Sequence, residues 1–325
     1  MFRSTITALA LAGVFMACSV AAADDPPKKL TGKDGKPLVI GFSQVGAESA
    51  WRTAESKSIR SEAEKRGVTL KFADAQQKQA NQIKAVRSFV AQRVDVIVIA
   101  PVVETGWEPV LRQAKRARIP IILVDRGIKV RDESLYVTLI ASDFVEEGRM
   151  AGEWLVRKLG GSGRVVQLEG TTGSAPAIDR KKGFEEVIAK HSGIEIIKSQ
   201  SADFTRAKGK EVMEAFLKAE RDKIDAVYAH NDDMAIGAIQ AIEEAGFDPG
   251  KDIILISIDA VHAAFEAMIA GQLNATVECN PLLGPALFDT IEKIIAGQQV
   301  PKYIKQVDQL FEQSIAAEVI KAREY

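Results

Sequence analysis

Two apolar runs, Val94-Asp-Val-Ile-Val-Ile99 and Ile119-Pro-Ile-Ile-Leu-Val124, decide the fold class of this chain. Nearly every side chain in them is apolar and most are β-branched, which is typical of strands buried on both faces of a parallel sheet. Residues 105–117, between the two runs, have the period of a helix with one apolar face. A strand, a helix and a second strand in this order predict a βαβ unit.

The same alternation continues in both directions along the chain. Strands at 38–42 and 68–72 and helices at 49–66 and 78–92 are predicted before the opening stretch. After a strand at 136–140 the rhythm starts again. The second series comprises helices at 144–159, 176–190, 206–220, 232–245 and 261–270, strands at 164–168, 194–198, 226–229, 253–258 and 274–278, and a last helix at 283–296. We therefore predict an α/β fold with two doubly wound parallel-sheet lobes.

Length and composition agree with a globular protein of two domains. The chain has 325 residues, of which 46% are hydrophobic and 27% charged, close to globular averages. These values exclude a disordered chain and a polytopic membrane protein. The formal net charge is −1, so no overall positive field would hold a polyanion, and we expect no nucleic-acid partner.

The first residues predict a secretory signal peptide at 1–23. Arg3 precedes a mostly apolar run at 6–20, and Ala21-Ala22-Ala23 offers a cleavage site. We therefore expect the mature chain outside the cytoplasm, with no membrane insertion after cleavage. A lipoprotein acylated on Cys18 is the alternative, although Phe15 stands where such a site usually has leucine.

The segment after the signal peptide, residues 24–37, is predicted to be a flexible leader, with ordered structure beginning at Leu38. Cleavage would leave Cys279 as the single cysteine, which excludes an intramolecular disulfide. The three histidines are scattered without a nucleophile signature, so we expect Cys279 to be a buried, inert thiol.

Polar residues follow the predicted strands where a ligand would bind. In open α/β sheets, ligands bind outside the carboxyl ends of the strands. Those ends are followed by Ser43-Gln44, Asp125-Arg126, Glu169 to Thr172, His230 to Asp233, and Asp259. Ser, Asp and Asn before a helix are also ordinary N-caps, and this alternative applies to Ser43, Asp143 and Asn231. Asp125-Arg126 could likewise be a structural ion pair.

Glu48, Trp51 and Arg52 have the spacing that would place them together on the first turn of a helix. An aromatic plate beside an acceptor and a donor suits a sugar, whose CH-rich face stacks on the ring while its hydroxyls bond to the charged groups. Trp51 could instead be a core residue, and the same alternative applies to Phe204.

Enzyme signatures are mostly absent from the sequence. There is no G-x-S-x-G elbow, P-loop, H-E-x-x-H motif or Cys/His cluster with metal spacing. We therefore expect no catalytic residue, no cofactor and no metal. A secreted enzyme acting on a sugar, with Asp125 or Glu48 as general acid or base, is a less favoured alternative.

From Leu38 onward the chain resembles the periplasmic sugar-binding proteins of ABC importers, of the ribose and galactose type. The marks of this resemblance are Ile119-Pro-Ile-Ile-Leu-Val-Asp-Arg126, Ala141-Ser-Asp143, Ala202-Asp-Phe-Thr-Arg206, Ala229-His-Asn-Asp-Asp-Met234, Ala235-Ile-Gly237 and Ile258-Asp259. Four further stretches are similar to the galactofuranose-binding branch: Gly41-Phe-Ser-Gln-Val-Gly46, Glu48-Ser49 with Trp51-Arg52, Ala100-Pro-Val-Val103 with Thr105-Gly-Trp-Glu-Pro109, and Ala177-Ile-Asp-Arg-Lys-Lys-Gly-Phe184. Ala50 and Cys279-Asn280 depart from that branch.

The resemblance implies a monomeric periplasmic protein that closes two lobes on one monosaccharide, galactofuranose in preference to ribose, and delivers it to the permease of an ABC importer. It implies lobes of residues 38–141 plus 280–309 and 142–279 plus 310–325, joined by three crossovers. The implied ligand contacts are Glu48, Trp51, Arg52, Asp125 and Arg126 in the first lobe, Asp143, Arg180, Phe204, Asn231 and Asp259 in the second, and Glu278 near a crossover. Galactose, ribose, arabinose or a polyol remains an alternative ligand, and a chemoreceptor remains an alternative or additional partner.

Overall fold

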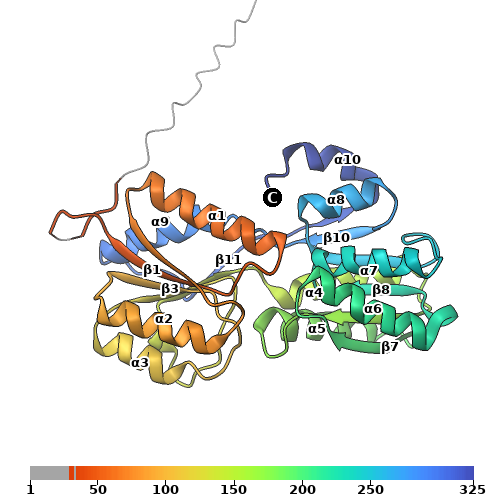
Figure 1. Cartoon of the computed structure of the whole chain (residues 1–325), viewed down its shortest axis with the longest axis horizontal. Helices are drawn as coiled ribbons and strands as arrows, with labels where there is room; N and C mark the ends of the chain where they lie inside the picture. The colour runs from red at the N-terminus through yellow and green to blue at the C-terminus, as the bar shows by residue number, and fades with distance from the viewer. Residues whose placement is uncertain (1–28, 33) are drawn as a thin grey trace, which may run out of the picture.

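The computed structural model describes residues 29–32 and 34–325, so the predicted signal peptide and Cys18 lie outside the described residues. The chain forms two six-stranded sheets. Each is covered by helices, and the two units lie side by side along the long axis of the molecule (Figure 1). We call them the first and second lobes. The predicted fold class is confirmed.

The first lobe is built on a sheet with the strand order β11-β5-β4-β3-β1-β2, in which all neighbours are parallel. Helices α1 and α9 pack together on one face, and α2 and α3 on the other (Figure 1). The strands are β1 Val39–Gln44, β2 Thr69–Asp74, β3 Val96–Ile99, β4 Ile121–Val124, β5 Thr138–Ala141 and β11 Tyr303–Lys305. The helices are α1 Ala50–Lys65, α2 Gln79–Ala91, α3 Glu108–Arg116 and α9 Gly284–Ile295.

The second lobe has the strand order β12-β10-β9-β8-β6-β7, with β12 antiparallel to β10. Helices α4 and α5 pack together, as do α6 and α7, and α8 packs against α7. The strands are β6 Gly163–Glu169, β7 Ile194–Ser201, β8 Ala226–Ala229, β9 Ile254–Asp259, β10 Ala275–Glu278 and β12 Leu310–Glu312. The helices are α4 Phe144–Lys158, α5 Ala175–Ile188, α6 Arg206–Glu220, α7 Asp232–Glu244, α8 His262–Ile269 and α10 Ala316–Val319, and the 3-10 helices are η1 Glu133–Leu135, η2 Arg221–Lys223, η3 Gln313–Ile315 and η4 Ile320–Ala322.

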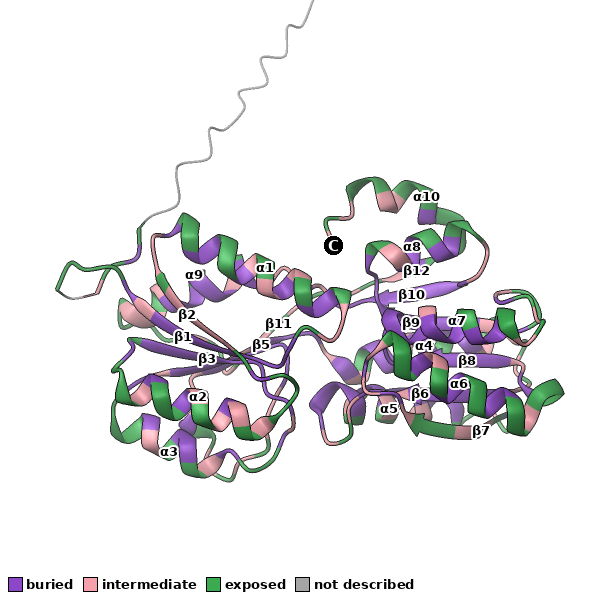
Figure 2. Cartoon of the chain, in the orientation of Figure 1, coloured by how far each residue is buried: buried purple, intermediate pink, exposed green. Residues whose placement is uncertain are grey.

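Strand β3 is buried on both faces of its sheet. Ile97 and Ile99 pack in one apolar cluster and Val96 and Val98 in another, so alternate side chains enter cores on opposite faces. Burying each such side chain contributes roughly 1.5–3 kcal/mol. The helices differ from this strand, because each has buried residues on one side and exposed residues on the other (Figure 2).

The chain crosses between the sheets three times, after β5, after β10 and after β11. Two of these crossovers are bonded to each other, because the Ser142 hydroxyl lies 3.0 Å from Asp308 Oδ1 and the Tyr303 hydroxyl donates to the Ser142 carbonyl. We propose that the lobes divide at these crossovers, into residues 38–141 plus 280–309 and residues 142–279 plus 310–325.

Ordered structure begins earlier than the predicted start at Leu38. Leu30 is buried in the core of the first lobe, and its N–H donates to the Arg66 carbonyl at 3.0 Å. Thr31 and Pro37 form an isolated bridge. One apolar residue in a polar stretch has no periodicity, so this contact could not be predicted from sequence patterns.

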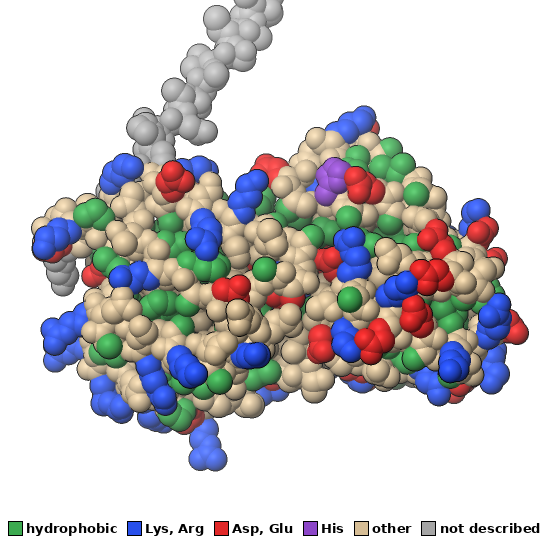
Figure 3. Space-filling view, viewed as in Figure 1, with side chains coloured by type: hydrophobic (Ala, Val, Ile, Leu, Met, Phe, Trp, Pro, Cys, Tyr) green, Lys and Arg blue, Asp and Glu red, His purple; other side chains and the backbone are tan. Residues whose placement is uncertain are grey.

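Charge is divided unevenly between the lobes. With the boundaries above, the first lobe has 20 Lys and Arg against 14 Asp and Glu, and the second has 18 against 27. Figure 3 shows acidic side chains gathered over the second lobe and basic ones over the lower part of the first. The near-zero total charge therefore conceals two lobes of opposite sign.

Candidate ligand-binding site

A small cavity lies between the lobes, at the carboxyl ends of the strands. The empty space within it is about 290 Å³, part of which is open to solvent. Nine of the eleven predicted contacts line it, and residues from both lobes contribute. The lining residues are Glu48, Ser49, Trp51, Arg52, Asp125, Arg126, Pro176, Arg180, Phe204, Asn231, Asp259 and Cys279.

Three of the lining residues have an unusual backbone conformation. Asp125 (φ 61°) follows β4, Asp259 (φ 122°) ends β9, and Phe204 (φ 60°) precedes α6. Residues other than glycine rarely adopt positive φ, and such strain is concentrated at functional sites. Here the strain turns three side chains toward the cavity at the strand ends.

Arg52 organises the charges of the first lobe. Its guanidinium lies 2.6 Å from Asp125 Oδ2, 2.5 Å from Glu55 Oε2 and 3.1 Å from Glu48 Oε1. Arg126 stands beside it, 3.4 Å from Asp125 and 3.8 Å from Glu48. The ion pair proposed for Asp125 as an alternative therefore exists, and both of its members also line the cavity.

Among the residues of this cluster that line the cavity, two buried atoms lack a hydrogen-bond partner within the described residues. They are Glu48 Oε2, an acceptor, and Arg126 Nε, a donor. Buried polar atoms are bonded in the great majority of cases, so an unbonded pair on a cavity wall marks a place for ligand groups. A hydroxyl, which both donates and accepts, matches this pair.

Arg180 organises the charges of the second lobe. Its guanidinium lies 2.7 Å from Glu147 Oε2 and 3.4 Å from Asp259 Oδ1, and it donates to the His230 carbonyl at 2.5 Å. Burial raises the pKa of Asp259, and the charge of Arg180 opposes this shift. Burial also lowers the pKa of His230, which is therefore a neutral ring.

Asn231 combines the two roles that the sequence left as alternatives. Its Oδ1 accepts from the Met234 N–H at 3.0 Å and so caps α7, while its Nδ2 donates to the Phe204 carbonyl at 3.2 Å. These two bonds fix the amide on the cavity wall. The cap therefore orients a polar side chain toward the cavity instead of competing with a site role.

Two aromatic rings complete the walls. Trp51 comes from the first lobe, but it packs in the core cluster of the second, and its indole N–H donates to the Cys279 carbonyl. The core alternative for Trp51 is thus true as well, since the ring is only 4% exposed. Phe204 faces the Arg126 guanidinium at 5.2 Å and lies directly on Gly170, where a Cβ would stand 1.9 Å from the ring.

Two predicted contacts lie outside the cavity lining. Asp143 caps α4 through the Glu146 N–H and pairs with Lys305 at 2.9 Å, as its N-cap alternative predicts. Glu278 pairs with Arg323 at 2.7 Å and accepts from the Tyr325 hydroxyl. Protein groups satisfy both carboxylates, so we do not include them among the proposed contacts.

The sequence reasoning missed five residues of the site. Ser49 and Pro176 line the cavity at the starts of α1 and α5, and Cys279 lines it beside Trp51. Cys279 is buried as predicted, and burial raises the pKa of its thiol.

Glu55 and Glu147 do not line the cavity, but each forms an ion pair with an arginine that does. Glu55 pairs with Arg52, and Glu147 pairs with Arg180. Only Glu55 had a sequence signal, its spacing of three from Arg52, and burial raises its pKa to about 7 against the opposing charge of Arg52.

The charges on the cavity wall balance. Three arginines face three carboxylates, those of Glu48, Asp125 and Asp259. A neutral molecule with several hydroxyls can bond to groups of both signs. Within residues 29–32 and 34–325, no group of three or more potential ligands is placed to hold a metal ion.

Comparisons with known proteins agree with this geometry. Residues 40–299 match the family model described as "Periplasmic binding protein domain". The galactofuranose-binding protein YtfQ of Escherichia coli is 60% identical over 269 residues, which cover 82% of this chain and 85% of that protein. Two solved structures are similar: the periplasmic component of the arabinose ABC transporter from Shewanella sp. ANA-3 bound to α- and β-L-arabinofuranose (55% identity, TM-score 0.86, covering 88% and 96% of the two chains), and a Mycobacterium smegmatis protein in complex with β-D-fucofuranose (52%, 0.87, 89% and 95%).

Proposed function

The chain belongs to the periplasmic binding protein family, and from this we infer that it captures a monosaccharide between its lobes and delivers it to an ABC importer. The charge-balanced cavity between the two lobes is the observation that carries this function. Binding involves no chemistry: a sugar that bonds to both walls stabilises the closed form, and the importer reads that form.

We propose that the ligand is a furanose with the ring configuration of D-galactose. D-galactofuranose, L-arabinofuranose and D-fucofuranose have the same configuration at C2, C3 and C4. They differ only in what C5 carries, which is a hydroxymethyl group, a hydrogen or a methyl group. Relatives that are more than half identical to this chain bear the names of these three sugars. The common ring and its hydroxyls are therefore the part that the site would recognise.

The residues of the cavity would divide the sugar's groups between them. The three carboxylates accept from hydroxyls, and the three arginines donate to hydroxyls and to the ring oxygen. Trp51 and Phe204 cover the CH-rich parts of the ring. The proposed contacts are Glu48, Trp51, Arg52, Asp125, Arg126, Arg180, Phe204, Asn231 and Asp259.

We place the mature protein in the periplasm as a monomer, with the permease subunits of the importer as its partner. The relatives are sugar-binding transport proteins, which supports this placement and supports binding over enzymatic action. None of the helices in the described part of the chain is both long enough and apolar enough to span a bilayer.

Thermal unfolding of the mature protein with a panel of sugars tests the proposal. A ligand that binds only the native state raises the midpoint by mass action. We expect galactose, L-arabinose and D-fucose to raise it through their furanose forms, and ribose to have less effect. The matched control is 4-deoxy-D-galactose, which lacks O4 and cannot close a furanose ring. An equal rise with that control would contradict the furanose proposal, and no rise with any sugar would contradict sugar binding.

A further inference from the structure

We propose that Asp233 is a latch between the lobes, which sets the affinity for sugar without touching it. The proposal rests on the function proposed above. Asp233 lies in the first turn of α7, two residues after Asn231, and is not part of the cavity lining. Its side chain is 8% exposed.

The two oxygens of this carboxylate bond to different lobes. Oδ2 accepts from the Ala50 N–H of the first lobe at 2.8 Å. Oδ1 accepts from Arg206 of the second lobe, at 3.0 Å from Nη2 and 3.3 Å from Nε. Arg206 therefore holds Asp233 in place within its own lobe, and the other oxygen is directed across the boundary.

Asp233 Oδ2 accepts a hydrogen bond from the start of α1, a helix whose first turn has no acidic residue of its own. Ala50 is the first residue of α1, Ser49 caps the Arg52 N–H, and the first turn of α1 contains no acidic residue. The first N–H groups of a helix are unbonded within it and carry partial positive charge. Asp233, from the other lobe, satisfies one of these groups and supplies the missing negative charge.

The starts of α1 and α7 both lie at the boundary between the lobes (Figure 1). Closing the lobes brings two partly positive helix ends together, and the charge of Asp233 between them offsets their repulsion. Opening would break the bond to Ala50 and leave the bond to Arg206 intact. The contact thus belongs to the closed form alone.

A contact made only in the closed form changes the affinity for sugar by changing the fraction of molecules that are closed. The apparent dissociation constant is the intrinsic one divided by the fraction of molecules able to close on the ligand. Loss of the latch should therefore weaken binding by the same factor for every sugar. The ratio of affinities between sugars should stay constant.

Asp233→Ala tests this directly. We expect a roughly tenfold loss of affinity for galactose, L-arabinose and D-fucose alike, since the lost bond has a charged acceptor. The loss should appear mainly as faster release, because the contact forms on closure after encounter. The unfolding midpoint of the free protein should change little. Unchanged affinity, or a loss that differs between sugars, would overturn the latch.

Asp225→Ala is the matched control. Asp225 also accepts from one backbone N–H, that of Arg164 at 2.7 Å, and from one guanidinium, that of the same residue at 3.0 Å. Both bonds lie within the second lobe. Asp225→Ala should therefore lower the midpoint of the free protein and leave sugar affinity unchanged, the reverse of the result for Asp233→Ala.

Ala50→Pro removes the donor in place of the acceptor. Proline is well tolerated at the first position of a helix, and Ser49 before it already has the extended conformation (φ −143°, ψ 163°) that proline requires. We expect a stable free protein with weakened binding. Ala50→Pro combined with Asp233→Ala should be no weaker than the more severe single variant, because both break one contact. Additive losses would overturn the latch.

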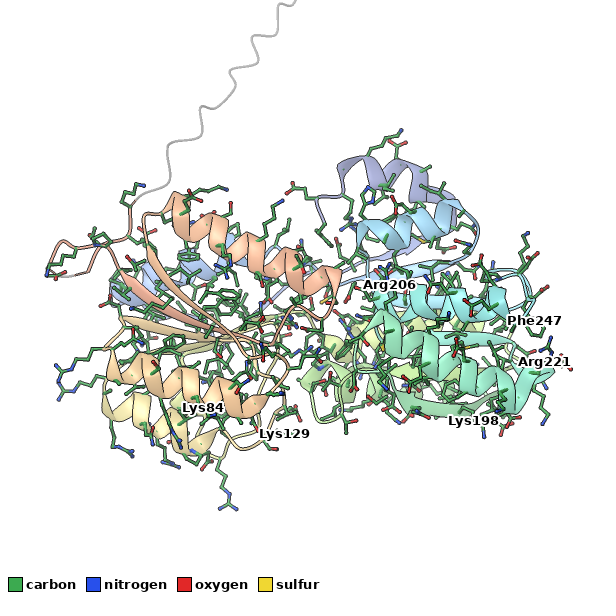
Figure 4. All side chains as sticks on the ribbon, viewed as in Figure 1. Lys84, Lys129, Lys198, Arg206, Arg221 and Phe247 are labelled. Atoms are coloured by element: carbon green, nitrogen blue, oxygen red, sulfur yellow. The ribbon has the colours of Figure 1, made fainter. Side chains whose placement is uncertain are left out.

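A measurement without sugar separates failure of the latch from failure of the proposed function. Lys84 and Lys198 lie on different lobes (Figure 4), and cysteines there would carry a pair of dyes in a Cys279→Ala background, because opening exposes the cavity that Cys279 lines. We expect Asp233→Ala and Ala50→Pro to shift the single-molecule distance distribution in the same direction. Identical distributions in the wild type and both variants would overturn the latch, whereas a wild type that binds no sugar would contradict only the proposed function.

Discussion

At the scale of single residues, Arg126 shows how a binding site differs from a structural ion pair. Burial and the neighbouring Arg52 lower the pKa of its guanidinium, so its charge is held in an unfavourable place. Its Nε has no hydrogen-bond partner among the described residues. Arg66, by contrast, lies 2.7 Å from Glu62 and 2.5 Å from Asp289, and the hydrogen bonds of these carboxylates raise its pKa against the effect of burial.

Arg126→Ala should abolish measurable sugar binding, since hydrogen bonds to a charged group are each worth roughly 1.5–3 kcal/mol. The free energy of unfolding of the free protein should change little, because Arg52 still pairs with Asp125 and Glu48 when Arg126 is removed. Calorimetric titration and urea unfolding measure the two effects. In the control Arg66→Ala, unfolding should become easier and binding should persist. A large loss of stability in Arg126→Ala would restore the purely structural role.

Gly170 supports the site through Phe204. A methyl group at position 170 would overlap the ring, because its Cβ would lie 1.9 Å from Phe204 Cζ. Gly170→Ala should displace the ring and weaken sugar binding by about tenfold, through lost contact area on the sugar. The control is Gly246→Ala, where nothing lies within 4 Å of the added Cβ, although its φ of 85° costs some stability. Equal affinities in the two variants would show that Phe204 does not contribute.

At the scale of elements, the long helices and most strands could be predicted within a few residues. Buried runs such as that of β3 and β4 alternate with helical periods, and topology then places their polar ends together. Strands β11 and β12 were missed, because three residues have no period. Asp143 and Glu278, by contrast, were predicted as ligand contacts but lie outside the cavity lining. Carboxylates suit a sugar ligand, but only the fold shows that Asp143 pairs with Lys305 and Glu278 with Arg323.

The crossover after β11 contains a group that should respond to pH. Burial and the charge of Glu147 raise the pKa of Asp308 to about 7, while the hydrogen bond to Ser142 and the charge of Arg180 oppose this shift. The folded protein then binds a proton that the unfolded chain has released, so stability falls as pH rises between about 4 and about 7.

Asp308→Asn should reduce this fall, because asparagine keeps the acceptor for Ser142 and does not titrate. Thermal midpoints of the free protein across this pH range provide the measurement. The slope against pH should be shallower in the variant than in the wild type. Parallel curves would show that Asp308 has an ordinary pKa.

At the scale of the whole molecule, the structure is a closed form. Trp51, Arg126 and Arg180 are at most 4% exposed, although all three line the cavity. A sugar therefore enters only when the lobes part, as in hinged binding proteins. Sequence patterns could not predict the contacts that hold this form together, since Ala50 and Asp233 are 183 residues apart. Whole-chain composition likewise concealed the opposite charges of the lobes.

The central claim is that the cavity selects a furanose ring, and the ring form of bound sugar tests it most directly. Galactose labelled with ¹³C at C1 has distinct anomeric resonances for its pyranose and furanose forms. The protein, unfolded and refolded to remove any carried ligand, would be titrated with this sugar and observed by NMR. We expect the bound sugar to show furanose resonances alone, although pyranose forms predominate in solution. A bound pyranose resonance would contradict the claim.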